Sequence, residues 1–375
     1  MNRRAFLRMT FGLGSMAALA AACGGQQAPA PASESSPTTA PAQPALAKSI
    51  NWYNWGEYIA ESVLEKFKQE FGVTVNVDVY GSNEEMEAKF KAGGNPGYDL
   101  ITPSDYMVAK MIASDMLEKI NFNNVPNFAL VDDAYKNTYF DPTNEYSVAY
   151  NQGATPFVYD KTRLPEPITH WRQVMEWPDS LRGKLGLLDD IRETMAMALR
   201  VLGYSGNTEN PEEINAARDA LIALKRRANF TLTDSPSIRA SLVAGDLFGA
   251  LAYTTDYIQG KRENPNLVAV LPDPMSTIWQ DNLCIPKGAR NKETAEAFIN
   301  FLCRPDIAAE NANEIGMGTP VKAALQQGLI DADLASDPVV YPNVEAMRDK
   351  LEYLRKGSPK MDELYQRAFD EVKSA

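Results

Sequence analysis

A regular alternation of strand-like and helix-like segments in residues 50–114 limits the possible folds more than any other feature of the sequence. The expected strands cover residues 50–53, 73–79 and 98–102, and the expected helices cover residues 61–71, 83–92 and 104–114. Alternating valines mark the second strand, and the first helix has apolar residues at helical spacing with Gly72 as a stop. Strands and helices that alternate in this way form parallel sheets with right-handed crossovers. We therefore expect an α/β fold whose ligand lies at the carboxyl ends of the strands.

A second α/β region follows from residue 147 onwards. Two extended segments are expected around Gly153, and the C-terminal stretch is mostly helical in pattern. Further strands are expected at 185–188, 230–233, 248–254, 267–271 and 283–285, and helices at 194–202, 211–227, 236–244 and 291–303. A chain of 375 residues has room for two such domains or for one large α/β unit.

The first 22 residues have the composition of an export signal. The run RRAFLR at residues 3–8 resembles a twin-arginine signal, and the apolar stretch 11–22 is too short to span a bilayer. Three alanines precede Cys23, as at a lipoprotein cleavage site, although Ala20 stands where leucine is usual. We expect cleavage before Cys23 and lipid attachment to Cys23. Cleavage after one of the alanines, which would release a freely soluble product, is the alternative.

Residues 23–48 are expected to form a flexible, lipid-anchored linker. They are rich in Ala, Pro, Ser and Gln and carry almost no charge, so they cannot bury a core. The folded part is expected to begin near Ser49, which places it close to a membrane without inserting it.

The composition argues against several classes of function. The formal net charge of −12 disfavours nucleic acid as a partner and suits a cationic ligand, although an acidic soluble protein with no such ligand is equally consistent with it. A histidine-based triad or metal site would have to use His170, which we interpret instead as a partly buried packing residue. Cys284 and Cys303 lie in apolar runs and are expected in the core, and their spacing does not decide whether they pair.

Two acidic residues, Asp190 and Glu193, stand at an expected strand-to-helix junction. One interpretation is a capping box, in which Asp190 caps the helix and Glu193 reaches back to it. The other is that both carboxylates face an opening at the strand end and receive a cation.

Aromatic or acidic residues follow expected strands in four places. They are Trp55, Glu57 and Tyr58 in the first loop, Asp105 and Tyr106 beside Ser104 in the second, Asp190 and Glu193 in the third, and Trp279 and Asp281 in the fourth. Each group alone is more typical of packing than of function. Four such groups at corresponding strand ends indicate a ligand site.

Five segments resemble the spermidine/putrescine-binding proteins of bacterial ABC polyamine uptake systems: NWYNWGEYI, YDLITPSDYMV, LLDDIRETMAMALRVLGYSGNT, IWQDNLCIP and NFLCRPDIA. The similarity runs from about residue 50 to about residue 318, with the motifs in the same order and spacing. It implies the periplasmic-binding-protein fold, which has two α/β lobes, a hinge and a central ligand cleft. The lobes expected from it cover residues 49–152 plus 276–325 and residues 153–275 plus 326–375.

The resemblance also implies roles for individual residues. Trp55, Glu57 and Tyr58 match the loop that contacts one end of the polyamine, Ser104 and Tyr106 match the second loop, Asp190 and Glu193 match the acids that receive an amino group, and Trp279 and Asp281 match the aromatic and acid beside the methylene chain and a nitrogen. Three positions depart from the family. Gly56 replaces a hydroxyl residue, Tyr253 stands where Trp is frequent in the ligand site, and Met317 stands where Tyr is common.

From these roles we expect a binding protein and not an enzyme, with no cofactor and no metal. It is expected to capture polyamines, deliver them to a membrane ABC permease, act as a monomer and bind no nucleic acid. Its expected location is the periplasm or the outer face of the cytoplasmic membrane, anchored through lipid on Cys23.

Spermidine is expected to bind more tightly than putrescine. Glu57, Asp190, Glu193 and Asp281 supply four acids, and a diamine would leave at least one of them without a cation in a poorly hydrated site. Three alternatives remain: a glycosidase with two carboxylates, a protein of this fold that binds a metal or another small cation, and a tethered polyamine sensor. Turnover of glycosides, metal analysis and identification of the partner would separate them.

Overall fold

The computed structural model describes residues 46–164, 166–342, 347, 350–355 and 357–375. The expected export signal, the lipid site at Cys23 and most of the expected linker 23–48 lie outside these residues. Near the start of the described chain, the backbone amide of Ala47 donates to the hydroxyl of Thr294 at 2.9 Å. No helix within the described residues combines the length and the apolar character needed to cross a membrane.

The first of two sheets contains seven strands in the order β12-β11-β3-β1-β2, with β4 and β5 also pairing with β11. Its strands are β1 (Ser49–Trp55), β2 (Thr74–Tyr80), β3 (Leu100–Ile101), β4 (Leu117–Glu118), β5 (Ser147–Thr155), β11 (Ser276–Pro286) and β12 (Leu351–Tyr353). β1 pairs in parallel with both β2 and β3, which confirms the expected parallel alternation at the start of the chain.

Helices cover both faces of this first sheet because successive side chains of β1 point to opposite faces. Trp52 packs in one cluster with Phe67 and Phe298, whereas Tyr53 packs in another with Met86 and Met107. We call this sheet and its helices the first half, and the second sheet with its helices the second half. The helices of the first half are α1 (Glu61–Phe71), α2 (Asn83–Gly93), α3 (Asp105–Ala113), α9 (Lys292–Leu302), α10 (Pro305–Ile315), α11 (Lys322–Gln326) and α12 (Ala332–Ala335). Short 3-10 turns occupy Phe122–Asn124, Pro126–Leu130 and Asp133–Tyr135.

The second sheet has five strands in the order β10-β6-β9-β7-β8. They are β6 (Phe157–Asp160), β7 (Leu185–Leu188), β8 (Thr231–Thr233), β9 (Gly249–Leu251) and β10 (Leu267–Val270). The accompanying helices are α4 (Trp171–Met175), α5 (Ile191–Val201), α6 (Pro211–Ala228), α7 (Ser235–Ala244), α8 (Thr254–Glu263) and α13 (Pro359–Ser374), with a 3-10 turn at Asp179–Leu181. β7 is parallel to β8 and β9, so its carboxyl end leads directly into α5.

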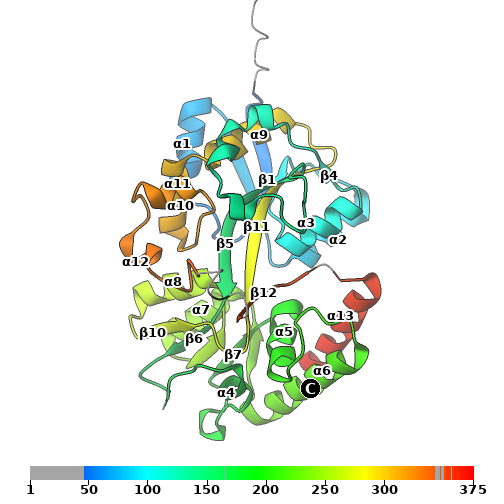
Figure 1. The fold of residues 1–375 in the computed structure, drawn as a ribbon, viewed down its shortest axis with the longest axis vertical. Coiled ribbons are helices and arrows are strands. Elements are labelled where there is room, and N and C mark those ends of the chain that lie inside the picture. The colour runs from blue at the N-terminus through cyan, green and yellow to red at the C-terminus, as the bar shows by residue number, and fades with distance from the viewer. Residues whose placement is uncertain (1–45, 165, 343–346, 348–349, 356) are drawn as a thin grey trace, which may run out of the picture. The chain divides into compact units, whose positions relative to one another are not determined.

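Two long neighbouring strands, β5 and β11, connect the two sheets (Figure 1). Only Pro156 separates β5 from β6 of the second sheet, and residues 271–275 lead from β10 into β11. β12 forms a third link, because it pairs with β11 along Ser276–Ile278 and precedes α13, which packs on α5 and α6. β12 belongs to the first sheet by pairing although it falls in the residue range expected for the second lobe. The lobe ranges themselves remain a prediction.

The structure differs from the sequence-based expectation in local details. Gly153 lies inside β5, not at a break between two segments, and residues 279–285 belong to one continuous strand. His170 is exposed at the start of α4, so the prediction of a partly buried packing histidine is wrong; its backbone amide donates to the side chain of Gln173. Cys284 and Cys303 are both buried and both free, which confirms their place in the core.

Candidate functional site

Asp281, in the middle of β11, is the centre of one group of predicted site residues. The hydroxyl of Ser104, which precedes α3, donates to one carboxylate oxygen of Asp281 at 2.6 Å, and the hydroxyl of Tyr58 donates to the other. The pairing of β5 with β11 shifts register between Asp281 and Asn282, and Ser104 forms an isolated bridge with Asp281. The structure therefore brings together residues from the first, second and fourth predicted groups. The fourth group does not follow a strand as predicted, because Trp279 and Asp281 lie inside β11.

The Asp281 carboxyl is 5 % exposed and has no cationic partner within ion-pair distance among the described residues. Burial raises its pKa to about 6, and the hydrogen bonds from Ser104 and Tyr58 offset only part of this effect. Ionising a buried carboxyl such as that of Asp281 costs free energy, and a cationic group of a ligand would stabilise its charged form.

Asp190 and Glu193 form a second acidic group at the carboxyl end of β7. One oxygen of Asp190 accepts the backbone amide of Glu193 at 3.0 Å, so Asp190 caps α5. This is one half of the expected capping box, and the hydrogen bonds among the described residues do not include the other half, from the Asp190 amide to the Glu193 side chain. Its other oxygen accepts the hydroxyl of Tyr253 at 3.1 Å. The structure places Tyr253 beside this acid, as predicted for a residue of the same site.

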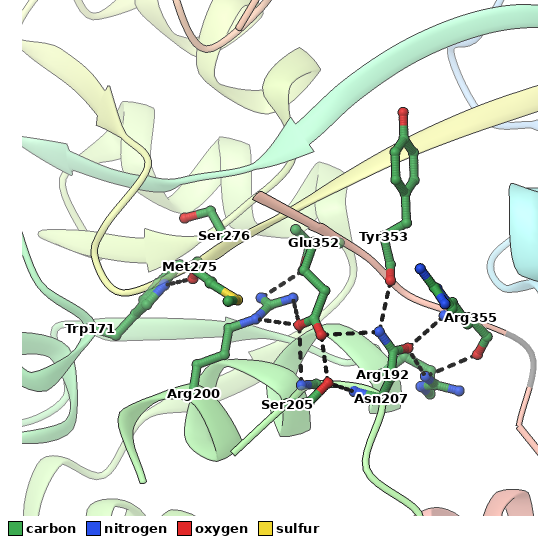
Figure 2. A network of polar contacts seen from close by, with 12 residues as sticks. Trp171, Arg192, Arg200, Ser205, Asn207, Met275, Ser276, Glu352, Tyr353 and Arg355 are labelled. Carbon is green, nitrogen blue, oxygen red and sulfur yellow. Dashed lines mark hydrogen bonds and ion pairs between the residues drawn. The ribbon is translucent and has the colours of Figure 1, made fainter. Parts of the chain in front are cut away.

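Glu193 is buried, and its carboxyl has no ion pair among the described residues. Burial and then the negative charge of Asp190 raise its pKa to about 7, although the charge of Arg200 counteracts them. Arg200 itself is engaged elsewhere: it pairs with Glu352 of β12 at 3.0 Å and donates to the hydroxyl of Thr277 on β11 at 2.9 Å. Figure 2 shows this network, in which Ser205 and Asn207 also bind Glu352. Arg200 thus ties α5 to both β11 and β12.

Aromatic rings lie next to these acids. Trp279 contacts Tyr253 edge-on, with ring centroids 6.0 Å apart, and it pairs across the strands with Gly153. A Cβ atom at Gly153 would lie 2.5 Å from the indole ring, so only glycine leaves room for Trp279 in this position. Trp55 lies at the end of β1, where its indole N–H donates to the backbone oxygen of Thr102 at 2.9 Å and its ring packs on Tyr80.

Tyr106 lies in the same region but its hydroxyl is directed to an acid that the sequence analysis did not single out. It donates to Glu84 of α2 at 3.0 Å, and the guanidinium of Arg192 lies 5.9 Å from its ring centre. Burial and then the charge of Asp190 raise the pKa of Glu84. Glu84 of the first half therefore lies close enough to Asp190 of the second for the charge of Asp190 to act on it.

Glu57 differs from the other predicted residues because a protein cation already neutralises it. Its carboxylate lies 2.8 Å from the guanidinium of Arg239 on α7, and its side chain is 56 % exposed. Its backbone has a φ of 54°, which L-residues rarely adopt. The structure does not place Glu57 in the buried group with Asp190, Glu193 and Asp281. Met317, another of the three positions that depart from the family, is buried in the core of the first half.

Several buried polar atoms near these residues have no hydrogen-bond partner. They are the indole N–H of Trp279, a carboxylate oxygen of Asp105, the amide N–H₂ of Asn151, the hydroxyl of Thr155 and both polar side-chain atoms of Asn54. Asn151 is the cross-strand partner of Asp281, and Thr155 is close enough to Glu193 to lower its pKa. Buried polar groups without partners are costly, so their concentration here indicates a place where a polar ligand or water binds. Sequence patterns give no signal for unsatisfied groups, which depend on the packed neighbours.

The arrangement can hold cationic nitrogen atoms beside apolar carbon. Buried carboxylates supply charged acceptors, and indole and phenol rings supply faces that suit both methylene groups and ammonium groups. Within the described part of the chain, no three His, Cys, Asp or Glu residues gather closely enough to hold a metal ion.

Comparison with known proteins gives a consistent result. Residues 62–341 match the family described as "Bacterial extracellular solute-binding protein". The spermidine/putrescine-binding periplasmic protein of Escherichia coli is 36 % identical over 302 residues, which cover 80 % of this chain and 85 % of that protein.

Solved structures show the same fold. The spermidine/putrescine ABC transporter substrate-binding protein PotD of Streptococcus pneumoniae superposes with a TM-score of 0.74 at 30 % identity, covering 88 % of this chain and 99 % of that one. The TpPotD lipoprotein of Treponema pallidum gives a TM-score of 0.75 at 30 % identity, covering 86 % and 99 % of the two chains.

Proposed function

Because the chain belongs to the bacterial extracellular solute-binding protein family, we propose that it captures a linear polyamine outside the cytoplasm and passes it to a membrane ABC permease. The names of the relatives, which include spermidine and putrescine, support this choice of ligand. Solute binding is the family's activity, and we propose no catalytic role for the acids of the site.

The observation that carries the proposal is a set of buried acids without protein cations. Asp281 and Glu193 are each less than a tenth exposed, and burial raises the pKa of both carboxyls. A polyamine supplies ammonium groups joined by methylenes, so one molecule can neutralise separate acids while its carbon chain contacts Trp279 and Tyr253. A compact metal cation has no use for the aromatic rings.

The proposed roles follow from the contacts. Asp281, held by Ser104 and Tyr58, receives one nitrogen, and Asp190 with Glu193 receives another. The larger proposed binding set adds the rings and the hydroxyl groups that surround these acids: Trp55, Tyr58, Ser104, Tyr106, Tyr253 and Trp279. Glu57 contributes to ligand binding indirectly, through its ion pair with Arg239.

Closure of the two halves on the ligand is the proposed way in which binding is signalled to the permease. Ligand atoms that bridge Asp281 on β11 and Asp190 at the start of α5 stabilise an arrangement in which both groups are near, which is differential binding to the closed state. The narrow connections through Pro156 and residues 271–275 suit hinge motion. Small-angle scattering should give a smaller radius of gyration with ligand than without it.

We further propose that the protein is a lipid-anchored monomer at the outer face of the membrane, held through Cys23. The motif around Cys23 and the name of the Treponema pallidum relative, a lipoprotein, support this. Metabolic labelling with a palmitate analogue, compared between wild type and Cys23→Ala, tests the anchor.

Calorimetric titration with putrescine, spermidine and spermine at one ionic strength tests the main proposal. We expect binding of spermidine to exceed that of putrescine by about 1–3 kcal/mol, the scale of one charge-assisted hydrogen bond. MgCl₂ serves as a control, since Mg²⁺ carries two charges but no methylene chain. Tight binding of Mg²⁺ without polyamine binding would contradict the proposal.

A further inference from the structure

Asp105, the first residue of α3, is a deeply buried acid in this region. It is 1 % exposed. One of its carboxylate oxygens accepts the backbone amide of Tyr106 at 2.6 Å, and the other has no hydrogen-bond partner. No Lys, Arg or His of the described chain lies within ion-pair distance of it. An acid at a helix N-terminus is common, but one that is buried with a free oxygen needs a different explanation.

The position of Asp105 places it beside the proposed ligand. Its neighbour Ser104 donates to Asp281 at 2.6 Å, and the amide of Asn282 donates to the backbone oxygen of Pro103 at 3.0 Å, so the start of α3 is fixed against β11. Burial raises the pKa of Asp105 well above its usual range, and the negative charges of Asp281 and Glu193 add to this effect, whereas the backbone amides of Tyr106 and Gln280 offset part of it. Asp105 therefore lies near both acids proposed to hold ammonium groups.

Two tyrosines line the same place. Tyr139 and Tyr353 lie with ring centroids 6.3 Å apart, and desolvation followed by the charge of Asp105 raises the pKa of each. Tyr139 is 42 % exposed, and the guanidinium of Arg355, 5.5 Å from its ring centre, lowers its pKa. Successive residues of a strand point to opposite faces. Figure 2 shows this for β12, where the ring of Tyr353 points away from the Glu352 network. The ring of Tyr353 therefore lies on the side of β12 away from Arg200 (Figure 2), and Asp105 is close enough for its charge to raise the pKa of Tyr353.

The sequence analysis counted Glu57 among the acids that pair with the ammonium groups of spermidine, but the structure does not leave its charge free for a ligand. Arg239 neutralises it at 2.8 Å, and more than half of its side chain is exposed. Asp105 offers what Glu57 lacks, namely burial, a free carboxylate oxygen and no protein cation.

We propose that Asp105 binds an additional ammonium group of the ligand, so that the site selects linear polyamines with three cationic nitrogens over those with two. This inference rests on the proposed function and refines it. Asp281, the Asp190–Glu193 pair and Asp105 then each receive one nitrogen. The rings of Tyr139 and Tyr353 contact the methylenes that lead to the nitrogen at Asp105.

The test compares the dissociation constants of spermidine and putrescine for wild type and Asp105→Asn by calorimetric titration at fixed salt. Asparagine keeps the size of the side chain and the acceptor for the Tyr106 amide. We expect Asp105→Asn to weaken spermidine binding at least about tenfold and putrescine binding less than about threefold. Equal losses for both ligands, or no loss for either, would overturn the assignment. If Asp105→Asn does not fold, Asp105→Ser replaces it, since serine suits the first turn of a helix.

Glu57→Gln is the matched control because it also removes one acid of the region. It is expected to leave the ratio of the two dissociation constants unchanged. A selective loss of spermidine binding in Glu57→Gln instead of Asp105→Asn would assign the third nitrogen to Glu57 and overturn the inference. If wild type binds neither polyamine, the proposed function itself fails, which is a different result from wild-type binding that Asp105→Asn does not alter.

Discussion

Arg239 on α7 lies 2.8 Å from Glu57, which follows β1, so an ion pair links the half built on the second sheet to the half built on the first. A second pair, between Lys110 of α3 and Asp362 of α13, links the halves at 3.0 Å. Both pairs involve partly exposed side chains, and water and salt screen such pairs. These two ion pairs can therefore stabilise the ligand-bound arrangement of the two halves and still break when the halves separate.

Glu57→Gln should raise the dissociation constant of every polyamine by a similar, small factor. An exposed ion pair contributes at most about 1 kcal/mol, or about fivefold in affinity. Arg239→Gln should do the same, and the double variant should cost little more than either single variant, because the two residues act as one pair. Dissociation rates measured by stopped flow at low and high salt check this. A hundredfold loss in Glu57→Gln alone would mean direct ligand contact.

Asp281→Asn should weaken polyamine binding by at least about tenfold while the protein melts at a near-normal temperature. The change leaves one ligand ammonium without its carboxylate, a cost of about 2–5 kcal/mol for a desolvated charge pair. The amide oxygen can still accept from Ser104 or Tyr58. Asp78→Asn, on the edge strand β2, is a control for loss of an acid elsewhere. Unchanged affinity in Asp281→Asn would remove this residue from the site.

Gly153→Ala should reduce affinity by displacing Trp279. The added Cβ atom would meet the indole at 2.5 Å and the hydroxyl of Thr254 at 3.2 Å, so the ring must move. Loss of one aromatic contact with a cation is worth about 0.5–2 kcal/mol, so we expect roughly a 2- to 30-fold weaker complex. Tryptophan fluorescence and calorimetry measure the two effects. Gly56→Ala, where no atom lies within 4 Å, is the matched control. Full affinity in Gly153→Ala would show that the ring position is unimportant.

Polyamine affinity should rise as pH increases from 5 to 8. Burial raises the pKa of Asp281 to about 6 and of Glu193 to about 7, so both must lose a proton to pair with ammonium groups. Unliganded protein should show the opposite trend in stability. An acid whose folded pKa lies above its unfolded value near 4 contributes stability that is present at low pH and lost as pH rises through the folded pKa.

Calorimetry in buffers of different ionisation enthalpy should detect the proton release, and Glu193→Gln should reduce it. Asp256 complicates the stability measurement, because burial raises its pKa to about 7 as well. Asp256→Asn should therefore change the pH dependence of melting but not that of binding. Affinity that does not vary between pH 5 and 8 would contradict this prediction.

Arg200→Gln should destabilise the fold by about 3–5 kcal/mol, since it leaves Glu352 largely buried without its cation. The same change removes the hydrogen bond from Arg200 of α5 to the hydroxyl of Thr277 on β11. Arg172→Gln is the control, because Arg172 and Glu176 form an exposed pair at 3.7 Å. Chemical denaturation of the three proteins checks the difference. Equal stability of Arg200→Gln and wild type would mean that Glu352 is solvated or otherwise paired.

Local patterns in the chain were sufficient to predict most of the strands and helices. The alternating valines of β2, the helical spacing in α1 and the proline at the start of α6 act on their own neighbourhoods, so they can be read without the fold. The α/β class followed from their order. The same reasoning placed the first three groups of acids and rings, because the carboxyl ends of parallel strands lie at one edge of a sheet. It was wrong for Trp279 and Asp281, which lie inside β11, a strand antiparallel to β3 and β5.

The partners of those residues could not be predicted in this way, because they come from distant segments that packing brings together. The pairing of Glu57 with Arg239, the fit of Gly153 under Trp279 and the free oxygen of Asp105 each depend on how α7, β11 and α3 are placed. Burial also decides which acid is costly to ionise, and burial is a property of the assembled neighbours and not of the residue type. An aspartate beside a serine and a tyrosine is unremarkable in a sequence; enclosed without a cation, it becomes a candidate ligand contact.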